Sequence, residues 1–233
     1  MKKVVINEKV YQLNSEVVGK PGFSGTVYHL NEDVDLAVKI YHQNDSGLFP
    51  EKEDIGYFAD CADQTLPVLL SQYAVFDLSG NYIGCAAPFL YEVSDTKKAI
   101  FQLSREKFLE YFHDIFATIP IFDQLGIELN DWSIQNIILG QGQHLRKRLY
   151  VIDDSNYGFL ARKRKNSTIH NELVEDIIDF YLEDYPDIKR SFIDEMSVKT
   201  DYFDFLKQNS SGYPTVGAYL DDYITTYQKK KIL

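Results

Sequence analysis

Short segments rich in β-branched and aromatic residues, separated by turn-forming residues, fill the first 41 positions of the chain. This pattern is typical of strands. We predict strands over residues 10–13, 16–19, 26–30 and 34–41. Two more are expected over 72–78 and 82–87, joined by a hairpin turn at Gly80. The N-terminal part of the chain is therefore predicted to be rich in β-structure.

The strand pattern gives way to a helical pattern after about residue 92. Ser104 can cap a helix in which apolar residues recur at helical spacing, and Pro120 should kink or end it. One helix is predicted earlier, over 51–61, and others are predicted over 171–182 and onward to about residue 228. The order predicts an α+β chain: a small antiparallel β lobe over 1–92, a mainly helical lobe over 93–233, and a ligand-binding cleft between them.

Composition narrows the classes of function. With 45% hydrophobic residues the 233-residue chain can form a real core, and its net charge of −11 disfavours nucleic acid as a partner. No apolar run approaches the roughly 18 residues of a membrane helix, and charges come too early for a signal peptide. Only Cys61 and Cys85 are present, and we expect reduced thiols and a cytoplasmic protein. The basic run 162–165 is either a solvated loop or a contact for an acidic substrate or partner.

In the β-rich part, a turn that contains glycines is followed, one predicted strand later, by a lysine. Gly22 and Gly25 lie between two predicted strands, where the missing Cβ atoms let a backbone approach phosphate oxygens. Lys39 follows Val27 by twelve residues, inside an apolar strand. Such a lysine either lies on a solvated strand face or reaches an anion, and the preceding glycine turn favours phosphates. We expect the strands of Val27 and Lys39 to be neighbours.

Polar residues at the ends of apolar segments form the second group. Asp131 and Asn136 are five residues apart and precede an apolar strand, and Asp153 directly follows the apolar residues 149–152. Carboxylate and amide oxygens are ligands that Mg²⁺ prefers. On a loop, Asp131 can face a hydroxyl group that is to be phosphorylated.

In order and spacing, these groups resemble the eukaryotic-type protein kinase superfamily over about residues 17–158. The resemblance implies a two-lobed protein-kinase-like fold that binds ATP and Mg²⁺. It implies an ATP- and Mg²⁺-dependent phosphotransferase acting on a hydroxyl group of an unidentified protein or small molecule. In such an enzyme Lys39 contacts the α- and β-phosphates, Asp131 is the catalytic base, and Asn136 and Asp153 bind magnesium.

The resemblance also assigns the nucleotide-binding residues. Gly22, Gly25 and Val27 would cover the nucleotide, and Phe89 and Tyr91 would belong to the hinge beside the adenine. A glutamate near the start of the 51–61 helix would pair with Lys39. Glu51 and Glu53 are both candidates, and we prefer Glu53.

Departures from the family pattern leave a second function open. Asn130 replaces the expected arginine, Ser133 replaces the expected lysine, and Asp154 and Ser155 replace Phe-Gly. The alternative is a kinase-like binding or regulatory module with little or no catalysis. Asp176 has two interpretations, a buried carboxylate that braces the loop of Asp131 or a surface acid on an amphipathic helix.

Overall fold

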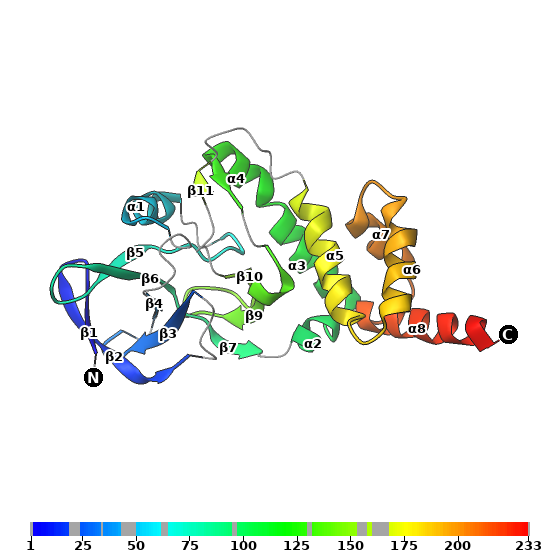
Figure 1. The fold of residues 1–233 in the computed structure, drawn as a ribbon, viewed down its shortest axis with the longest axis horizontal. Helices are drawn as coiled ribbons and strands as arrows, with labels where there is room; N and C mark the ends of the chain where they lie inside the picture. The colour runs from blue at the N-terminus through cyan, green and yellow to red at the C-terminus, as the bar shows by residue number, and fades with distance from the viewer. Residues whose placement is uncertain are drawn as a thin grey trace.

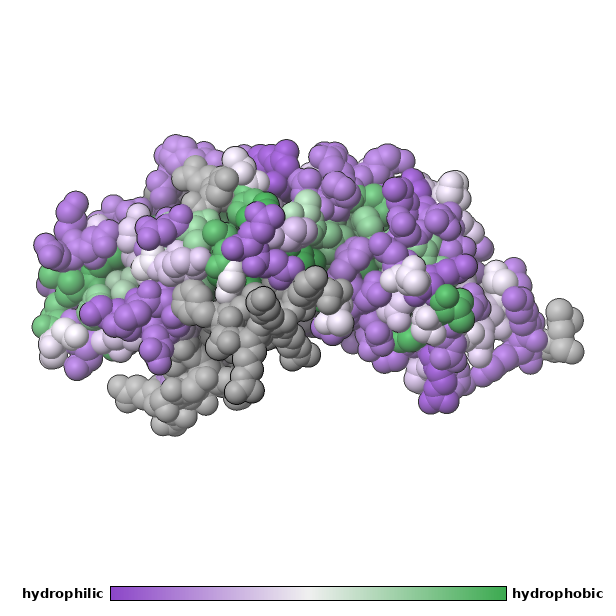
Figure 2. All heavy atoms as spheres, turned by 90° about the horizontal axis from the view of Figure 1, so that it is seen from above, coloured by the Kyte–Doolittle hydropathy of each residue, from purple (hydrophilic) through white to green (hydrophobic). Residues whose placement is uncertain are grey.

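The computed structural model describes residues 2–18, 24–33, 35–42, 50–61, 65–94, 97–129, 132–152, 158–159 and 168–232. The molecule is elongated, with most strands gathered at the N-terminal end and most helices at the other (Figure 1). Polar side chains cover most of the face shown in Figure 2, with hydrophobic side chains exposed in patches between them. Within the described part of the chain, no helix combines the length and apolar character needed to cross a membrane.

Six antiparallel strands close into a barrel. Around the barrel they run in the order β1, β2, β3, β4, β6, β5, and the Val5–Phe76 pair between β1 and β5 completes the circle. Their bounds are β1 Lys3–Ile6, β2 Lys9–Val17, β3 Gly25–Leu30, β4 Leu36–Tyr41, β5 Tyr73–Phe76 and β6 Tyr82–Pro88. The buried side chains of these strands form one cluster: Val4, Ile6, Leu13, Leu30, Val38, Ile40, Val75 and Ala86.

Helix α1 (Lys52–Cys61) packs beside β5 on the outside of the barrel. It buries Ile55 and Phe58 in a second hydrophobic cluster, which also takes in Cys85 from β6. Residues on neighbouring positions of a strand point to opposite faces. Because Val38 and Ile40 face the barrel interior, Lys39 between them faces the outside, where its cross-strand partner is Cys85.

The described residues after β6 are mainly helical but contain two small sheets. Strands β10, β9 and β7 form one sheet, and β11 pairs with β8 in the other. The strand bounds are β7 Tyr91–Ser94, β8 Ile127–Glu128, β9 Ile137–Gln141, β10 Arg148–Val151 and β11 Gly158–Phe159. The helices are α2 Lys97–Phe101, α3 Arg105–Phe116, α4 Ile119–Leu125, α5 Ile169–Tyr181, α6 Pro186–Ser197, α7 Tyr202–Asn209 and α8 Val216–Ile232, with a 3₁₀ turn, η1, at Ile134–Asn136.

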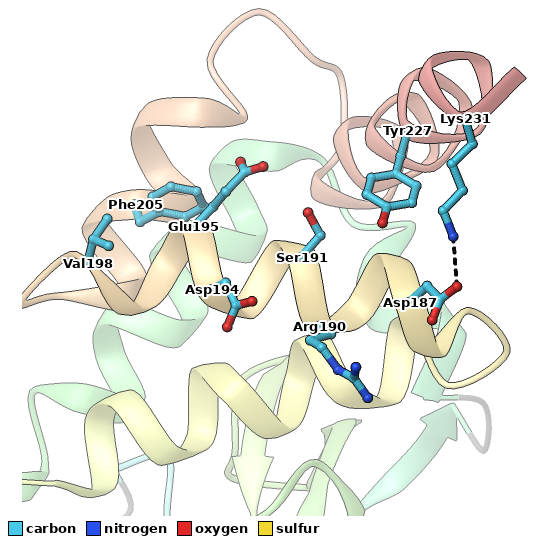
Figure 3. A pocket seen from close by; sticks show the side chains of 9 residues that line it. All are labelled: Asp187, Arg190, Ser191, Asp194, Glu195, Val198, Phe205, Tyr227 and Lys231. Carbon is cyan, nitrogen blue, oxygen red and sulfur yellow. Dashed lines mark hydrogen bonds and ion pairs between the residues drawn. The ribbon is translucent and has the colours of Figure 1, made fainter. Parts of the chain in front are cut away.

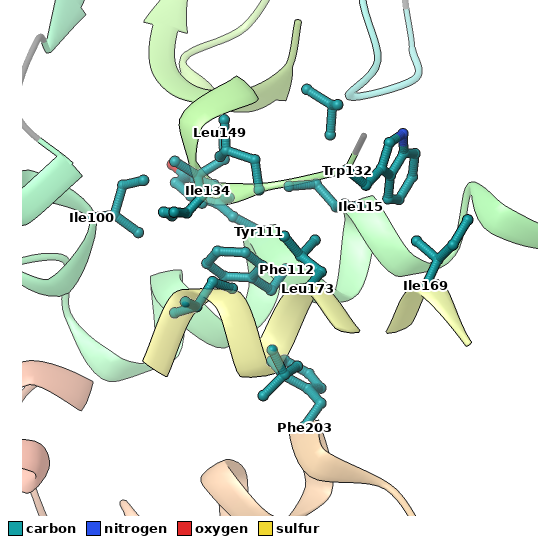
Figure 4. Close-up of a cluster of buried hydrophobic side chains, with 14 of the residues drawn as sticks. Ile100, Tyr111, Phe112, Ile115, Trp132, Ile134, Leu149, Ile169, Leu173 and Phe203 are labelled. Atoms are coloured by element: carbon teal, nitrogen blue, oxygen red, sulfur yellow. The ribbon is translucent and has the colours of Figure 1, made fainter. Parts of the chain in front are cut away.

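The large cluster is centred between α3, α5 and the short strands. Figure 4 shows Phe112 and Ile115 of α3 packed near Ile134, Leu149 and Leu173, and all five side chains are buried. Apolar burial of this kind contributes about 25 cal/mol per Å². This cluster holds η1 and β10 against the long helices, and so fixes the segments that carry Asn136 and Ile152.

The cap at Ser104 and the turn at Gly80 lie where the sequence predicts them, but the helix that was expected to reach Pro120 ends earlier. The Ser104 hydroxyl accepts a hydrogen bond from the Lys107 N–H and caps α3. Pro120 lies in the first turn of α4, so the helix that it was expected to kink or end has already ended at Phe116. Gly80 adopts a positive φ of 84° in the hairpin turn between β5 and β6.

One strand prediction needs correction, and one strand was missed. Residues 16–17 continue β2 and form no separate strand, while residue 19 lies outside the described residues. The first strand, β1, was not predicted. It exists because Asn7 and Glu8 turn the chain with positive φ angles of 48° and 63° and pair β1 with β2. The usual sequence signal of a tight two-residue hairpin is Asn-Gly, and Asn-Glu carries no such signal.

Candidate functional site

Gly25, Val27 and Lys39 come together on the β3–β4 hairpin. Val27 is paired directly with Lys39, so the prediction that their strands are neighbours is confirmed. A Cβ atom at Gly25 would lie 2.7 Å from the Ile40 carbonyl oxygen and 3.2 Å from Lys39 Cγ. Only glycine permits this close approach, which puts the Gly25 backbone beside the half-buried lysine side chain. Gly22 lies outside the described residues.

A glycine of β6 also presses against Lys39. A Cβ atom at Gly84 would lie 2.0 Å from the Lys39 carbonyl oxygen, a distance that no side chain tolerates. Gly84 was not predicted as a site residue, although an isolated glycine inside an apolar strand signals close backbone approach. Lys39 is thus held by glycine contacts on both sides, from β3 and from β6.

Asn136 immediately precedes β9, and Ile152 immediately follows β10. Because the two strands are antiparallel, both residues lie at the same end of the pair. The Ile152 N–H donates to the Asn136 carbonyl oxygen at 2.7 Å, and Ile137 pairs with Val151. The Asn136 N–H in turn donates to the Ser133 carbonyl oxygen at 3.0 Å. Asn136 is therefore fixed opposite Ile152, the residue that immediately precedes Asp153 in the sequence.

Asp131, Asp153 and the basic run 162–165 lie outside the described residues, as do Asn130, Asp154 and Ser155. Their predicted roles remain predictions. Among the described residues, no group of three or more His, Cys, Asp or Glu side chains is arranged to hold a metal ion.

Asp176 of α5 holds the turn that leads to Asn136. Its Oδ2 accepts a hydrogen bond of 2.5 Å from the Ile134 N–H, and the contact is partly buried. A carboxylate that accepts from a backbone N–H makes one of the stronger hydrogen bonds in proteins. Of the two interpretations of Asp176, this contact matches the one in which its carboxylate supports the loop of Asp131, and not the surface acid.

Glu51 and Glu53 lie at the start of α1, beside a cavity of about 1040 Å³ near the end of β4. Tyr41, His42 and Tyr82 also line this cavity. Burial raises the pKa of the Tyr41 phenol well above its usual range, and nearby Cys85 and Tyr82 raise it further. The pairing of Lys39 with one of the two glutamates stays a prediction.

Phe89 and Tyr91 are held against the barrel. The Phe89 ring packs on His29 of β3, with ring centroids 3.9 Å apart, and on Tyr91, with centroids 5.0 Å apart. The Tyr91 hydroxyl donates to Asp35 Oδ1 at 2.7 Å, and the Phe89 N–H donates to the Asp35 carbonyl oxygen at 2.7 Å. The Asp35 carboxylate that accepts this bond raises the pKa of the Tyr91 phenol.

Asp35 was missed by the sequence analysis because its partners are 54 to 56 residues away. Just after the polar residues 31–33, it looks like an ordinary turn acid. The structure makes it the residue that ties the segment after β6 to the β3–β4 turn. Both cysteines are reduced, with Cys85 buried and Cys61 half-buried.

Comparison with known proteins does not assign this chain to a family. No family model matches the chain, and no curated protein matches it. Among solved structures, the chain is similar to one described as the crystal structure of Rad53 1-466 in complex with AMP-PNP, with a TM-score of 0.44 and 16% sequence identity. The match covers 61% of this chain and 38% of that chain, so this chain spans well under half of the matched structure. The likeness is too distant to assign a family.

Proposed function

We propose that this protein is an ATP- and Mg²⁺-dependent phosphotransferase with a two-lobed, protein-kinase-like fold. The barrel and α1, within residues 1–92, form the nucleotide-binding lobe, and residues 93–233 form the catalytic lobe. The γ-phosphoryl group of ATP passes to a hydroxyl group on a protein or small molecule. The bond to the ADP oxygen breaks, a bond to the acceptor oxygen forms, and the acceptor proton goes to Asp131.

The observation that carries the proposal is the hydrogen bond from the Ile152 N–H to the Asn136 carbonyl oxygen. It joins the two chain segments from which the sequence predicts magnesium ligands, although they are 16 residues apart. An amide oxygen from Asn136 and a carboxylate oxygen from Asp153 fit the preference of Mg²⁺ for oxygen ligands. When bound, the ion would neutralise phosphate charge during transfer.

Lys39 is the proposed phosphate-binding cation. Its side chain faces away from the barrel interior, and the Gly25 backbone lies against it. Backbone that approaches without a Cβ atom leaves room for phosphate oxygens beneath the turn. Gly22 and Val27 are proposed to complete this cover, and Glu53 stays our preferred acidic partner of Lys39.

Phe89 and Tyr91 are proposed to lie beside the adenine as part of the segment joining the lobes. Because the Tyr91 hydroxyl is already bonded to Asp35, it positions this segment and leaves base recognition to other groups. Asp176 is a positioning residue for the turn of Asn136.

The test is thermal unfolding with ATP alone, with ATP and Mg²⁺, and with ATP and chelator. A ligand that binds only the folded state adds about 2.7 kcal/mol to the free energy of unfolding when its concentration is 100 times its Kd. We expect ATP with Mg²⁺ to raise the Tm, and Lys39→Ala and Asp153→Asn to remove most of the shift while remaining folded. Absence of any shift at millimolar nucleotide contradicts the proposal.

Catalysis is tested separately, because Ser133 in place of the expected lysine favours the alternative of a binding module. Radiolabelled ATP is offered with generic acceptors and with cell extract. Asp131→Asn should abolish labelling and leave the ATP-induced Tm shift nearly intact. If wild type binds ATP but labels nothing, the protein is a nucleotide-binding module and the phosphotransferase assignment is wrong.

A further inference from the structure

A groove of about 810 Å³ lies between the last three helices, on the part of the molecule farthest from the barrel (Figures 1 and 3). Helix α6 supplies most of its lining, α7 contributes Phe205, and α8 contributes Tyr227 and Lys231. Val198 lines the same groove and is 77% exposed, so it adds apolar surface to the groove. The groove is therefore lined by both apolar and polar side chains.

One wall of the groove is mainly acidic, because three carboxylates and a single basic side chain, Arg190, line it from α6. Asp187, Asp194 and Glu195 lie along the α6 face that lines it. Asp187 is already paired with Lys231 of α8 at 2.8 Å, and Glu195 accepts a hydrogen bond of 2.7 Å from the Tyr223 hydroxyl. Glu195 has a second carboxylate oxygen, and the side chain of Asp194 is exposed. Two carboxylates therefore remain available along the groove beyond the Asp187–Lys231 pair.

The last turn of α8 carries the opposite charge. Lys229, Lys230 and Lys231 are consecutive and exposed, in a chain whose net charge is −11. Successive helical residues are rotated by about 100°, so the three lysines point in different directions. With Lys231 turned toward Asp187, Lys229 and Lys230 are directed away from the groove of their own chain. Figure 1 shows this end of α8 projecting beyond the other helices.

We propose that the groove receives the last turn of α8 from a second copy of this chain, in a two-fold symmetric dimer. Lys229 and Lys230 of each copy meet Asp194 and Glu195 of the other, and Val198 and Tyr227 become covered. An isologous interface requires a patch that contains both a feature and its complement. The basic turn and the acidic groove satisfy this requirement, because Lys231 and Tyr227 of α8 form one wall of the groove.

The first test is the mass of the 233-residue protein in solution, measured by sedimentation at about 50 mM and about 500 mM salt over a range of concentrations. We expect a reversible dimer whose Kd rises with salt, because exposed charge pairs are screened. Lys229→Glu combined with Lys230→Glu should raise the Kd at least about tenfold. The matched control, Lys3→Glu with Lys9→Glu, makes the same charge change at the barrel end and should leave the Kd unchanged.

The decisive test is a charge exchange. Asp194→Lys with Glu195→Lys should also weaken self-association. Mixed one to one with the Lys229→Glu, Lys230→Glu protein, it should form a heterodimer. The lysines in the groove of one variant then meet the glutamates in the turn of the other, and the remaining turn and groove keep their original charges. A wild type that stays monomeric at about 100 µM and low salt overturns the proposal, as does a mixture that stays monomeric. None of these residues belongs to the proposed nucleotide site, so the ATP-induced Tm shift reports on that proposal independently.

Discussion

The carboxylate of Asp176 connects α5 to the turn that carries Asn136. Ile134, whose N–H donates to it, is itself buried, and its side chain packs in the large cluster. A buried backbone N–H that loses its acceptor costs the full desolvation penalty of the group. The position of Asn136 therefore depends on a residue 40 positions further along the chain.

Replacing Asp176 tests this dependence. Asp176→Ala should lower the free energy of unfolding by about 1–3 kcal/mol, measured by urea denaturation. Asp176→Asn keeps an oxygen acceptor and should cost less. Glu172→Gln, an exposed position on the same helix, serves as control and should change stability by no more than about 0.5 kcal/mol. Equal effects of Asp176→Ala and Glu172→Gln would contradict the bracing role.

At the scale of the elements, strand β4 lies between β3 and β6, and the backbones of both neighbours approach the β4 backbone closely. Gly25 of β3 and Gly84 of β6 both approach the backbone at Lys39 and Ile40 more closely than a Cβ atom allows. The barrel can therefore keep its curvature here only with glycine at these positions. In α1, by contrast, a Cβ atom at Gly56 would meet nothing within 4 Å.

The same substitution should therefore have opposite effects in these two elements. Gly84→Ala forces β6 away from β4 and should destabilise the protein by about 1–3 kcal/mol. Gly56→Ala lies in a helix interior with free space and should stabilise it by about 0.4–1 kcal/mol. Thermal and urea unfolding of both variants measures the difference. A stabilising or neutral Gly84→Ala would show that β6 does not press on Lys39.

At the scale of the whole molecule, barrel and helices share contacts that join them into one unit. The large cluster extends from Phe58 of α1 and Cys85 of β6 to the helices after residue 100. The Tyr57 hydroxyl of α1 donates to the Leu125 carbonyl oxygen at the end of α4 at 2.6 Å. The Leu69 N–H, between α1 and β5, donates to the Val151 carbonyl oxygen of β10 at 2.9 Å.

Because the two parts share a core, we expect one cooperative unfolding transition in urea. Trp132, the single tryptophan, is buried in this shared cluster, so its fluorescence reports on the centre of the molecule. Far-UV circular dichroism reports on strands and helices together. The two transitions should coincide, and separate midpoints would mean that barrel and helical part unfold independently.

Much of the fold followed from local patterns. The helix at α1, the cap at Ser104 and the β5–β6 hairpin lie where the sequence predicted them, because each depends on residues within a few positions. The missed strand β1 and the closure of the barrel depend on pairing with β2 and β5. The Val5–Phe76 pair between β1 and β5 joins residues 71 positions apart, and periodicity carries no record of it.

For the candidate site, the sequence by itself determined which residues are candidates for the proposed chemistry: a lysine in an apolar strand, and Asp and Asn residues at the ends of apolar segments. Side-chain type and local spacing are enough for that. Only the tertiary structure decided that Gly84 presses on Lys39, that Asp176 holds the turn of Asn136, and that Asp35 holds Tyr91. Each of these contacts joins residues more than 40 positions apart. Such pairs are brought together by burial of the shared core, which no local pattern encodes.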